Sequence, residues 1–159
     1  MKNIAIQAKT AHITMGPTGF IVYARDFLNA YKRFKTDKPF SPAKYYLVCR
    51  SVELSLKSYL LLNNVPIKKV KYNLSHDLHK ILRKSKELGI DTVVGITDEE
   101  KAEIEKANSW YNRKGFEYFD IQNIVEGKDT LPNLNIMFYL ADRLINILKP
   151  ICLASAIKP

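Results

Sequence analysis

The chain has 159 residues, of which 47% are hydrophobic and 26% charged, values typical of one globular domain with a single core. Its 6 glycines and 7 prolines argue against a loop-rich β architecture, and charged residues interrupt the longest apolar segments, which excludes a membrane-spanning helix. The formal net charge of +9 is concentrated between residues 30 and 90, which contain fourteen Lys or Arg and four Asp or Glu, against eleven and twelve elsewhere. This cationic half would attract nucleic acid, nucleotide phosphates or an acidic protein, although a solvated basic face without a ligand would have the same composition.

The amino-terminal sequence contains no sustained apolar run, so we expect no signal peptide, a cytoplasmic location and no membrane attachment. We predict one domain over residues 1–159, with a helical core of about 17–150 that follows a flexible amino-terminal segment. The two cysteines, Cys49 and Cys152, lie in apolar helical surroundings without metal-ligand spacing. They are expected to be buried thiols, with a structural disulfide as the alternative.

The first predicted helix, residues 20–35, repeats large apolar residues at intervals of three or four positions. These residues are Phe20, Tyr23, Phe27, Tyr31 and Phe34. Arg25, Asn29 and Lys32 fall on the opposite side, a pattern typical of an amphipathic helix. The prolines in "DKPFSP" end this helix, because proline removes a backbone donor and restricts the residue before it.

The second predicted helix has Ser41 as its N-cap and Pro42 in the first helical position, and it ends at "NNVP". A basic linker, "IKKVKYN", leads to a third helix over residues 76–88, whose expected N-cap is Ser75. Asp77 would then lie near the positive end of the helix dipole, and Gly89 would terminate the helix.

Thr97 and Glu100 have capping-box spacing at the start of a fourth predicted helix, residues 98–113. Helical periodicity is lost over residues 114–130, which predicts a long aromatic loop with at most a short extended piece. The last helix is expected to begin near Pro132 and to stop at Pro150. Together these segments predict an all-α fold, an antiparallel up-and-down bundle of four to five helices.

The most informative stretch is "VELSLKSYLLLNN", an apolar helix that places two charged residues one turn apart among its leucines. Glutamate before lysine at this spacing is the favourable orientation for a helical ion pair. A helical hairpin would bring the start of the next helix back toward this pair, so the sequence predicts an interhelical polar site. Its members would be Arg50, Glu53, Lys57, His76 and Asp77. The alternative is an ordinary exposed salt bridge beside capping residues.

The same residues carry a resemblance to a known family. The pattern E-L-x-L-K-x-x-L at residues 53–60, followed by "SHDLHKIL" at the start of the next helix, resembles a branch of the HEPN superfamily. The segment "ANSWYNRKGFEYF" is similar to the L-N-x-x-Y ending of the fourth helix in that branch. The resemblance covers roughly residues 20–148. A glycine commonly precedes the histidine in these proteins, where this chain has Ser75.

The resemblance implies an all-α bundle, frequent homodimerisation and work on RNA or nucleotides. Many members are metal-independent ribonucleases, and others are non-catalytic binding modules or partners of nucleotidyltransferases in toxin–antitoxin-like pairs. The ribonucleases carry an arginine followed, after four to six residues, by a histidine. This chain lacks that signature, because no arginine precedes His12, His76 or His79 at that distance.

Two further segments are candidates for binding. Two histidines in "HDLH" have a spacing that can share zinc, but a structural site needs four ligands, so we expect no metal and no cofactor. The segment "WYNRKGFEYF" interleaves aromatic and basic residues, and its candidate ligand contacts are Tyr111, Arg113, Lys114 and Tyr118. Such residues stack on bases and meet phosphates, although they would equally serve a dimer interface or pack over the end of the bundle.

We therefore expect a HEPN-like domain that binds RNA or a nucleotide, without catalysis and as a homodimer. One alternative is a divergent ribonuclease of a toxin–antitoxin-like system, in which Arg113 stabilises charge while His76 and Glu53 complete the site. A second alternative is a protein-interaction module whose basic half docks an acidic partner.

Overall fold

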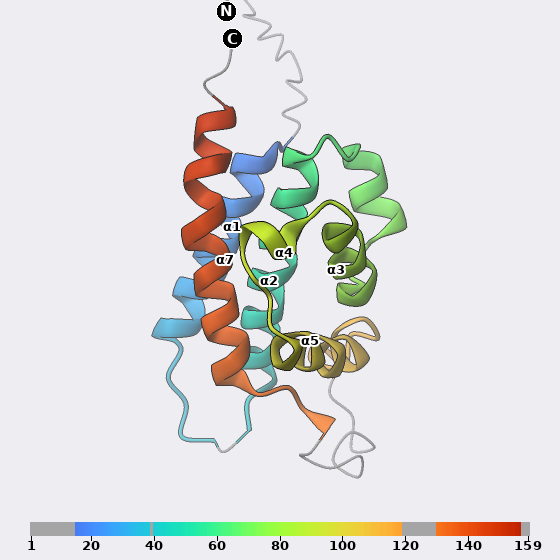
Figure 1. Ribbon diagram of the computed structural model, residues 1–159. Helices are drawn as coiled ribbons and strands as arrows, with labels where there is room; N and C mark the ends of the chain where they lie inside the picture. The colour runs from blue at the N-terminus through green and yellow to red at the C-terminus, as the bar shows by residue number, and fades with distance from the viewer. Residues whose placement is uncertain (1–14, 39, 119–129, 157–159) are drawn as a thin grey trace, which may run out of the picture.

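A computed structural model describes residues 15–38, 40–118 and 130–156, and all regular structure within these residues is helical (Figure 1). The predicted all-α class is confirmed for this part of the chain. The helices are α1 (Pro17–Arg33), α2 (Pro42–Leu62), the π-helix η1 (Lys69–Asn73), α3 (Leu78–Glu87), α4 (Ile90–Val93), α5 (Asp98–Tyr111) and α7 (Leu134–Ser155). The predicted flexible amino-terminal segment and most of the predicted aromatic loop lie outside the described residues.

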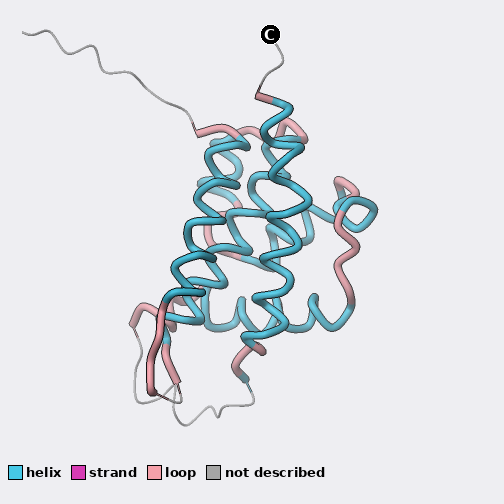
Figure 2. Tube along the Cα trace, turned by 90° about the vertical axis from the view of Figure 1, so that its left-hand side faces the viewer, coloured by secondary structure: helices cyan, strands magenta, loops and turns pink. Residues whose placement is uncertain are grey.

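Three long helices, α1, α2 and α7, lie side by side and form the body of the fold (Figure 2). α1 is antiparallel to α7, since the Thr18 hydroxyl donates to the Cys152 carbonyl near one end and Lys32 pairs with Asp142 near the other. The short connection between α1 and α2 makes that pair antiparallel too, so α2 and α7 run parallel. α5 lies across the direction of all three in both views. The antiparallel order that we predicted is thus correct for α1 and each neighbour, but not for α2 and α7.

α2 is the centre of the core. Every residue from 51 to 60 is buried, because α1, α7, α3 and α5 surround this helix. Its serines remain satisfied: the Ser55 hydroxyl donates to the Ser51 carbonyl, and the Ser58 hydroxyl donates to the Ser55 carbonyl. The Ser51 hydroxyl donates to the Ala24 carbonyl of α1 at 2.8 Å, so two small residues bring these helices close together.

The buried face of α1 differs from the predicted aromatic stripe. Ile21, Ala24 and Leu28 are buried, whereas Tyr23 is 50% exposed and Phe34 lies beyond the end of the helix. The close contact with α2 requires a small residue at its centre, so the large rings are displaced to its margins. The members of the stripe that remain partly buried are Phe20, Phe27 and Tyr31.

Several predicted helix ends are confirmed. α2 begins at Pro42, and Thr97 and Glu100 form the reciprocal capping box at the start of α5. Gly89 has a φ of 83°, a left-handed conformation that ends α3, although the short helix α4 follows directly. The predicted linker "IKKVKYN" contains η1, in which the Leu74 amide donates to the Lys69 carbonyl.

The predicted stop at Pro150 is wrong, since α7 continues through this residue to Ser155. Proline removes one backbone hydrogen bond of the helix. Its neighbours on the core side, Leu148 and Cys152, are both fully buried, and the Cys152 carbonyl accepts from Thr18. The tertiary packing of residues on both sides of the proline therefore outweighs the loss of this backbone hydrogen bond.

Both cysteines are free and buried, as predicted. Burial, reinforced by the negative charge of Glu53, raises the pKa of the Cys49 thiol, so this group is an unreactive part of the core. None of the described helices combines the length and the apolar character needed to cross a membrane.

Candidate functional site

A buried carboxylate lies at the junction of three segments. The Glu53 side chain, on α2, has no exposed surface. Arg50 Nη1 lies 3.0 Å from both of its oxygens, and Lys57 Nζ lies 2.5 Å from Oε1. His76 Nδ1 lies 3.2 Å from both oxygens, and the Tyr111 hydroxyl donates to Oε2 at 2.5 Å. These five residues are called the Glu53 cluster below.

The helical spacing of α2 places Arg50 and Lys57 on the same face as Glu53, one turn before and one turn after it. Lys57 Nζ also donates to the carbonyl of Ser75, which ties α2 to the turn before α3. Tyr111 is the last residue of α5. The cluster therefore joins α2, the turn before α3 and the end of α5.

The turn before α3 differs from the prediction. Ser75 is not the N-cap: it has a φ of 46°, and Asp77 caps α3 by accepting from the Lys80 amide at 3.0 Å. His76 therefore precedes the helix, and the left-handed turn at Ser75 lets its ring reach Glu53. A positive φ at this position also explains physically why glycine would be favoured there.

Asp77 is not a member of the Glu53 cluster, which corrects the predicted set. Its Oδ1 accepts from the Asn108 side chain at 3.3 Å, and Asn108 Oδ1 accepts from the Leu78 amide at 2.8 Å. This pair of hydrogen bonds fastens the start of α3 to α5. Asp77 thus supports the site by positioning the helix that follows His76.

Tyr111 is the member of the cluster that sequence reasoning misplaced. The sequence pattern groups it with Arg113, Lys114 and Tyr118 as a ligand contact at one end of the bundle. Its hydroxyl lies inside, whereas Tyr118 is 73% exposed and Lys114 is exposed with a φ of 60°. The Arg113 guanidinium lies over the Trp110 ring, 4.8 Å from its centroid. The sequence did contain an indication that Tyr111 is buried: it follows Ala107, on the buried face of α5, by four residues, or about one helical turn.

The charges of the cluster are set by its contacts. Burial alone would raise the pKa of Glu53, but the His76 hydrogen bond and the charges of Lys57 and Arg50 outweigh it and lower the pKa to about 2. Burial, followed by the charge of Glu53, raises the pKa of Tyr111, so its hydroxyl stays protonated and donates. At neutral pH one carboxylate thus faces two basic side chains, and the cluster carries excess positive charge.

This excess charge reaches the surface at one edge. The side chain of Arg50 is 24% exposed and that of His76 is 50% exposed, while Lys57 and Glu53 are buried. His76 Nδ1 lies near both the Glu53 carboxylate, which only accepts hydrogen bonds, and Arg50 Nη1, which only donates them. The two carboxylate contacts favour a proton on Nδ1, and the approach of Arg50 Nη1 is then a contact without a hydrogen bond. The other ring nitrogen, Nε2, is then left without a proton in the neutral imidazole. The exposed edge can therefore bind an anion or accept a proton.

The two histidines of "HDLH" have different partners. His79 Nδ1 lies 2.6 Å from Glu105 Oε1 on α5, whereas His76 faces Glu53. Within residues 15–38, 40–118 and 130–156, no three His, Cys, Asp or Glu side chains are grouped as a metal site requires.

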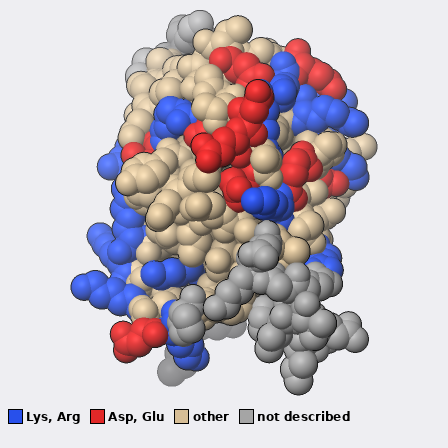
Figure 3. Space-filling view, turned by 60° about the horizontal axis from the view of Figure 1, so that its bottom comes forward, with Lys and Arg blue, Asp and Glu red and all other residues tan. Residues whose placement is uncertain are grey.

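The cationic half of the sequence forms two patches rather than one face. The first patch, on η1 and α3 and the residues beside them, contains Lys68, Lys69, Lys71, Lys80, Arg83 and Lys86, all exposed. The second patch, at the end of α1 and in the loop after it, contains Lys32, Arg33, Lys35 and Lys38. The two parts of the fold lie on opposite sides of α2 in Figure 1. Figure 3 shows Lys and Arg side chains on both sides of one face, with a band of Asp and Glu side chains between them.

Glu53→Ala is expected to lower the free energy of unfolding by more than ~2 kcal/mol, because it leaves Arg50, Lys57 and Tyr111 without their shared acceptor. Urea unfolding followed by circular dichroism measures the loss. Glu105→Ala removes a half-exposed carboxylate that also pairs with a histidine, and it is expected to cost less than ~1 kcal/mol. Equal losses in the two variants would contradict a special role for the buried group.

Stability is expected to fall as the pH drops from about 4.5 toward about 2, because folding lowers the pKa of Glu53. The contribution is complete above the ordinary pKa of 4.5 and amounts to roughly 3 kcal/mol, at about 1.4 kcal/mol for each tenfold change in proton affinity. Glu53→Gln should reduce this loss of stability in acid when the free energy of unfolding is measured with urea at about pH 3, 5 and 7. An equal loss in the variant and the wild type would assign the pH dependence to other carboxylates.

Ser75→Gly is expected to raise the free energy of unfolding by about 0.5 to 1 kcal/mol, because glycine adopts a positive φ without strain. The carbonyl that accepts from Lys57 is retained in this variant. Ser75→Ala, which keeps the strain, is the matched control and should give no gain. Thermal and urea unfolding of both variants measure the difference, and a loss of stability in the glycine variant would rule out strain at this turn.

No protein-family model, no curated protein and no solved structure matches this chain significantly. The case for a function therefore comes from the chain's own residues. The strongest local observation is the Glu53 cluster, whose exposed edge of Arg50 and His76 adjoins the first basic patch.

Proposed function

We propose that this protein is a HEPN-like helical domain that binds RNA or a nucleotide without cleaving it. Two of the three motifs on which the resemblance rests meet in space, because Glu53 and Lys57 contact His76 and the carbonyl of Ser75. The third motif supplies Tyr111 to the same carboxylate. This convergence supports the family proposal, since each contact could have been absent.

The observation that carries the binding proposal is the position of the exposed, positively charged edge of the Glu53 cluster. His76 lies in the turn between η1 and α3, so the chain carries lysines of the first basic patch both before and after it. Tyr72, on η1, is 70% exposed and has Lys71 Nζ 5.2 Å from its ring centroid. An exposed ring beside lysines can stack on a base while the cations neutralise phosphates.

One observation favours a ribonuclease as the second candidate. His76 is half exposed and contacts Glu53 through Nδ1, the arrangement in which Nε2 could accept a proton from a 2′-hydroxyl group. Arg50, rather than the predicted Arg113, would supply the nearby cation, because its Nη1 lies 3.1 Å from His76 Nδ1. We rank this candidate second, because Nη1 of Arg50 already contacts both oxygens of Glu53.

RNA binding is tested by fluorescence anisotropy with a labelled single-stranded RNA over a range of salt concentrations. The logarithm of the affinity is expected to fall linearly with the logarithm of salt concentration. Lys68→Ala/Lys71→Ala should reduce this slope by about 1.4, since each phosphate contact on a single strand contributes about 0.7. The control Arg25→Ala/Lys149→Ala removes the same charge from α1 and α7, outside the patch, and should leave the slope unchanged.

The outcomes separate the three classes of function. Affinity that does not depend on salt, or equal effects of the two double variants, would contradict phosphate binding at the first patch and favour a protein-interaction module. Cleavage of the labelled RNA in the same samples, lost in His76→Ala, would replace the binding proposal with the ribonuclease.

A further inference from the structure

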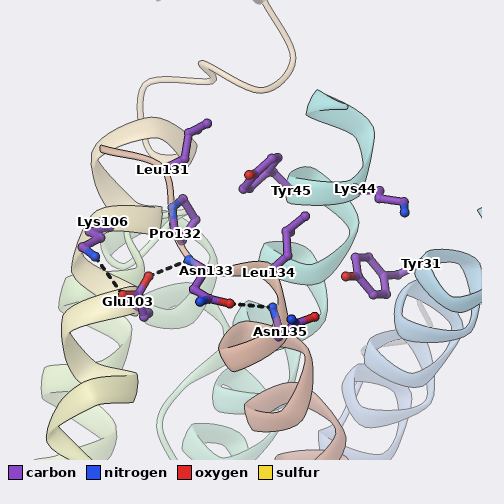
Figure 4. A pocket seen from close by; sticks show the side chains of 10 residues that line it. All are labelled: Tyr31, Lys44, Tyr45, Glu103, Lys106, Leu131, Pro132, Asn133, Leu134 and Asn135. Atoms are coloured by element: carbon purple, nitrogen blue, oxygen red, sulfur yellow. Dashed lines mark hydrogen bonds and ion pairs between the residues drawn. The ribbon is translucent and has the colours of Figure 1, made fainter. Parts of the chain in front are cut away.

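A pocket of about 590 Å³ lies between α1, α2, α5 and the start of α7 (Figure 4). Its volume is in the usual range for small-ligand sites. Tyr31 comes from the end of α1, Lys44 and Tyr45 from the first turn of α2, Lys106 from α5, and Asn135 from the first turn of α7. Figure 4 shows the tyrosines and Lys44 on one side of the pocket and Lys106 on the opposite side.

The side chains of this pocket are mainly hydrogen-bond donors. Three polar groups of the pocket have no hydrogen-bond partner among the described residues. They are the hydroxyl of Tyr31, the hydroxyl of Tyr45 and the side-chain amide of Asn135. Lys44 Nζ lies 6.0 Å from the centroid of the Tyr31 ring and makes no ion pair with a described carboxylate. Burial raises the pKa of both tyrosines, which keeps their hydroxyls protonated at neutral pH. The pocket thus offers ammonium, hydroxyl and amide donors together.

The pocket also contains one carboxylate, but its charge is already neutralised. Glu103 Oε1 lies 2.8 Å from Lys106 Nζ, and Glu103 Oε2 accepts from the Asn133 backbone amide at 2.6 Å. The positive charge of Lys44 is therefore left in excess. The second basic patch, which adjoins Tyr31 at the end of α1, adds to this positive potential.

We propose that this pocket binds a phosphate group. A tetrahedral oxyanion accepts several hydrogen bonds at once, which matches a pocket lined by donors from three helices, α1, α2 and α7. The source would be a free nucleotide or the backbone of an RNA strand, since both present the same group. The site is separate from the Glu53 cluster: Tyr45 and Glu53 are eight residues apart on α2, or about 12 Å along the helix axis. The inference does not rest on the proposed function, because no residue of that cluster lines the pocket.

Amide NMR spectra of the full-length protein, titrated with inorganic phosphate, AMP and a hexanucleotide RNA, test the proposal. Saturable shifts are expected at the amides of Tyr45 and Asn133–Ile136 with phosphate and AMP. Lys44→Gln and Tyr31→Phe/Tyr45→Phe should each weaken AMP binding by about tenfold, because a charged or hydroxyl donor is lost. The phenylalanine variants retain the rings that stack on Phe116 and Phe138, so the fold is preserved. Lys149→Ala is the charge control and should bind as the wild type does.

Each result bears on one claim. Non-saturating shifts spread over surface lysines, or equal weakening in Lys149→Ala, would overturn the pocket. RNA binding that the pocket variants weaken would identify the backbone as a source, and RNA binding that they leave intact would identify the free nucleotide. RNA shifts at η1 and α3 without phosphate or AMP shifts at Asn133–Ile136 would remove the pocket and leave the proposed function in place.

Discussion

The ionised carboxylate of Glu53 is the constraint on which the surrounding structure depends. A charge without solvent contact costs several kcal/mol unless other groups replace its water, and here four side chains do so. Two of them belong to α2 itself, but His76 and Tyr111 must be supplied by other segments. The turn before α3 and the end of α5 are consequently held against the middle of α2. Strain at Ser75 is tolerated because it allows this arrangement.

The same constraint links structure to surface chemistry. Anchoring by Glu53 holds Arg50 and His76 at the edge of the core, where they border the lysines of η1 and α3. A positive edge whose members are fixed by buried contacts is preorganised, and binding an anion there would require little further ordering of side chains. The second basic patch lies beside a pocket at another corner of the fold, so the cationic residues contribute to two separate environments.

Local sequence was sufficient to predict those structural features that depend on interactions between residues close together in the chain. The start of α2 at Pro42, the N-cap of α5 at Thr97 and the end of α3 at Gly89 were predictable, because capping and backbone preferences act within a few residues. The pairing of Glu53 with Lys57 follows from helical spacing alone. The continuation of α7 through Pro150 was not predictable in this way, since it depends on burial of residues on both sides of the proline.

The amino-acid pattern was thus enough to establish the helical class, most of the long helices and an acid, an amine and an imidazole as candidates for one site. Which side chains from other segments contact that acid was decided only by the tertiary structure. Tyr111 is 58 positions away from Glu53 in the chain, so its contact depends on how α5 crosses α2. Asp77 was excluded from the cluster by a two-residue shift in the start of α3, which a left-handed turn at Ser75 produces. The division of the basic residues into two patches has the same origin, because the basic residues before α2 and those after it lie on opposite sides of this buried helix.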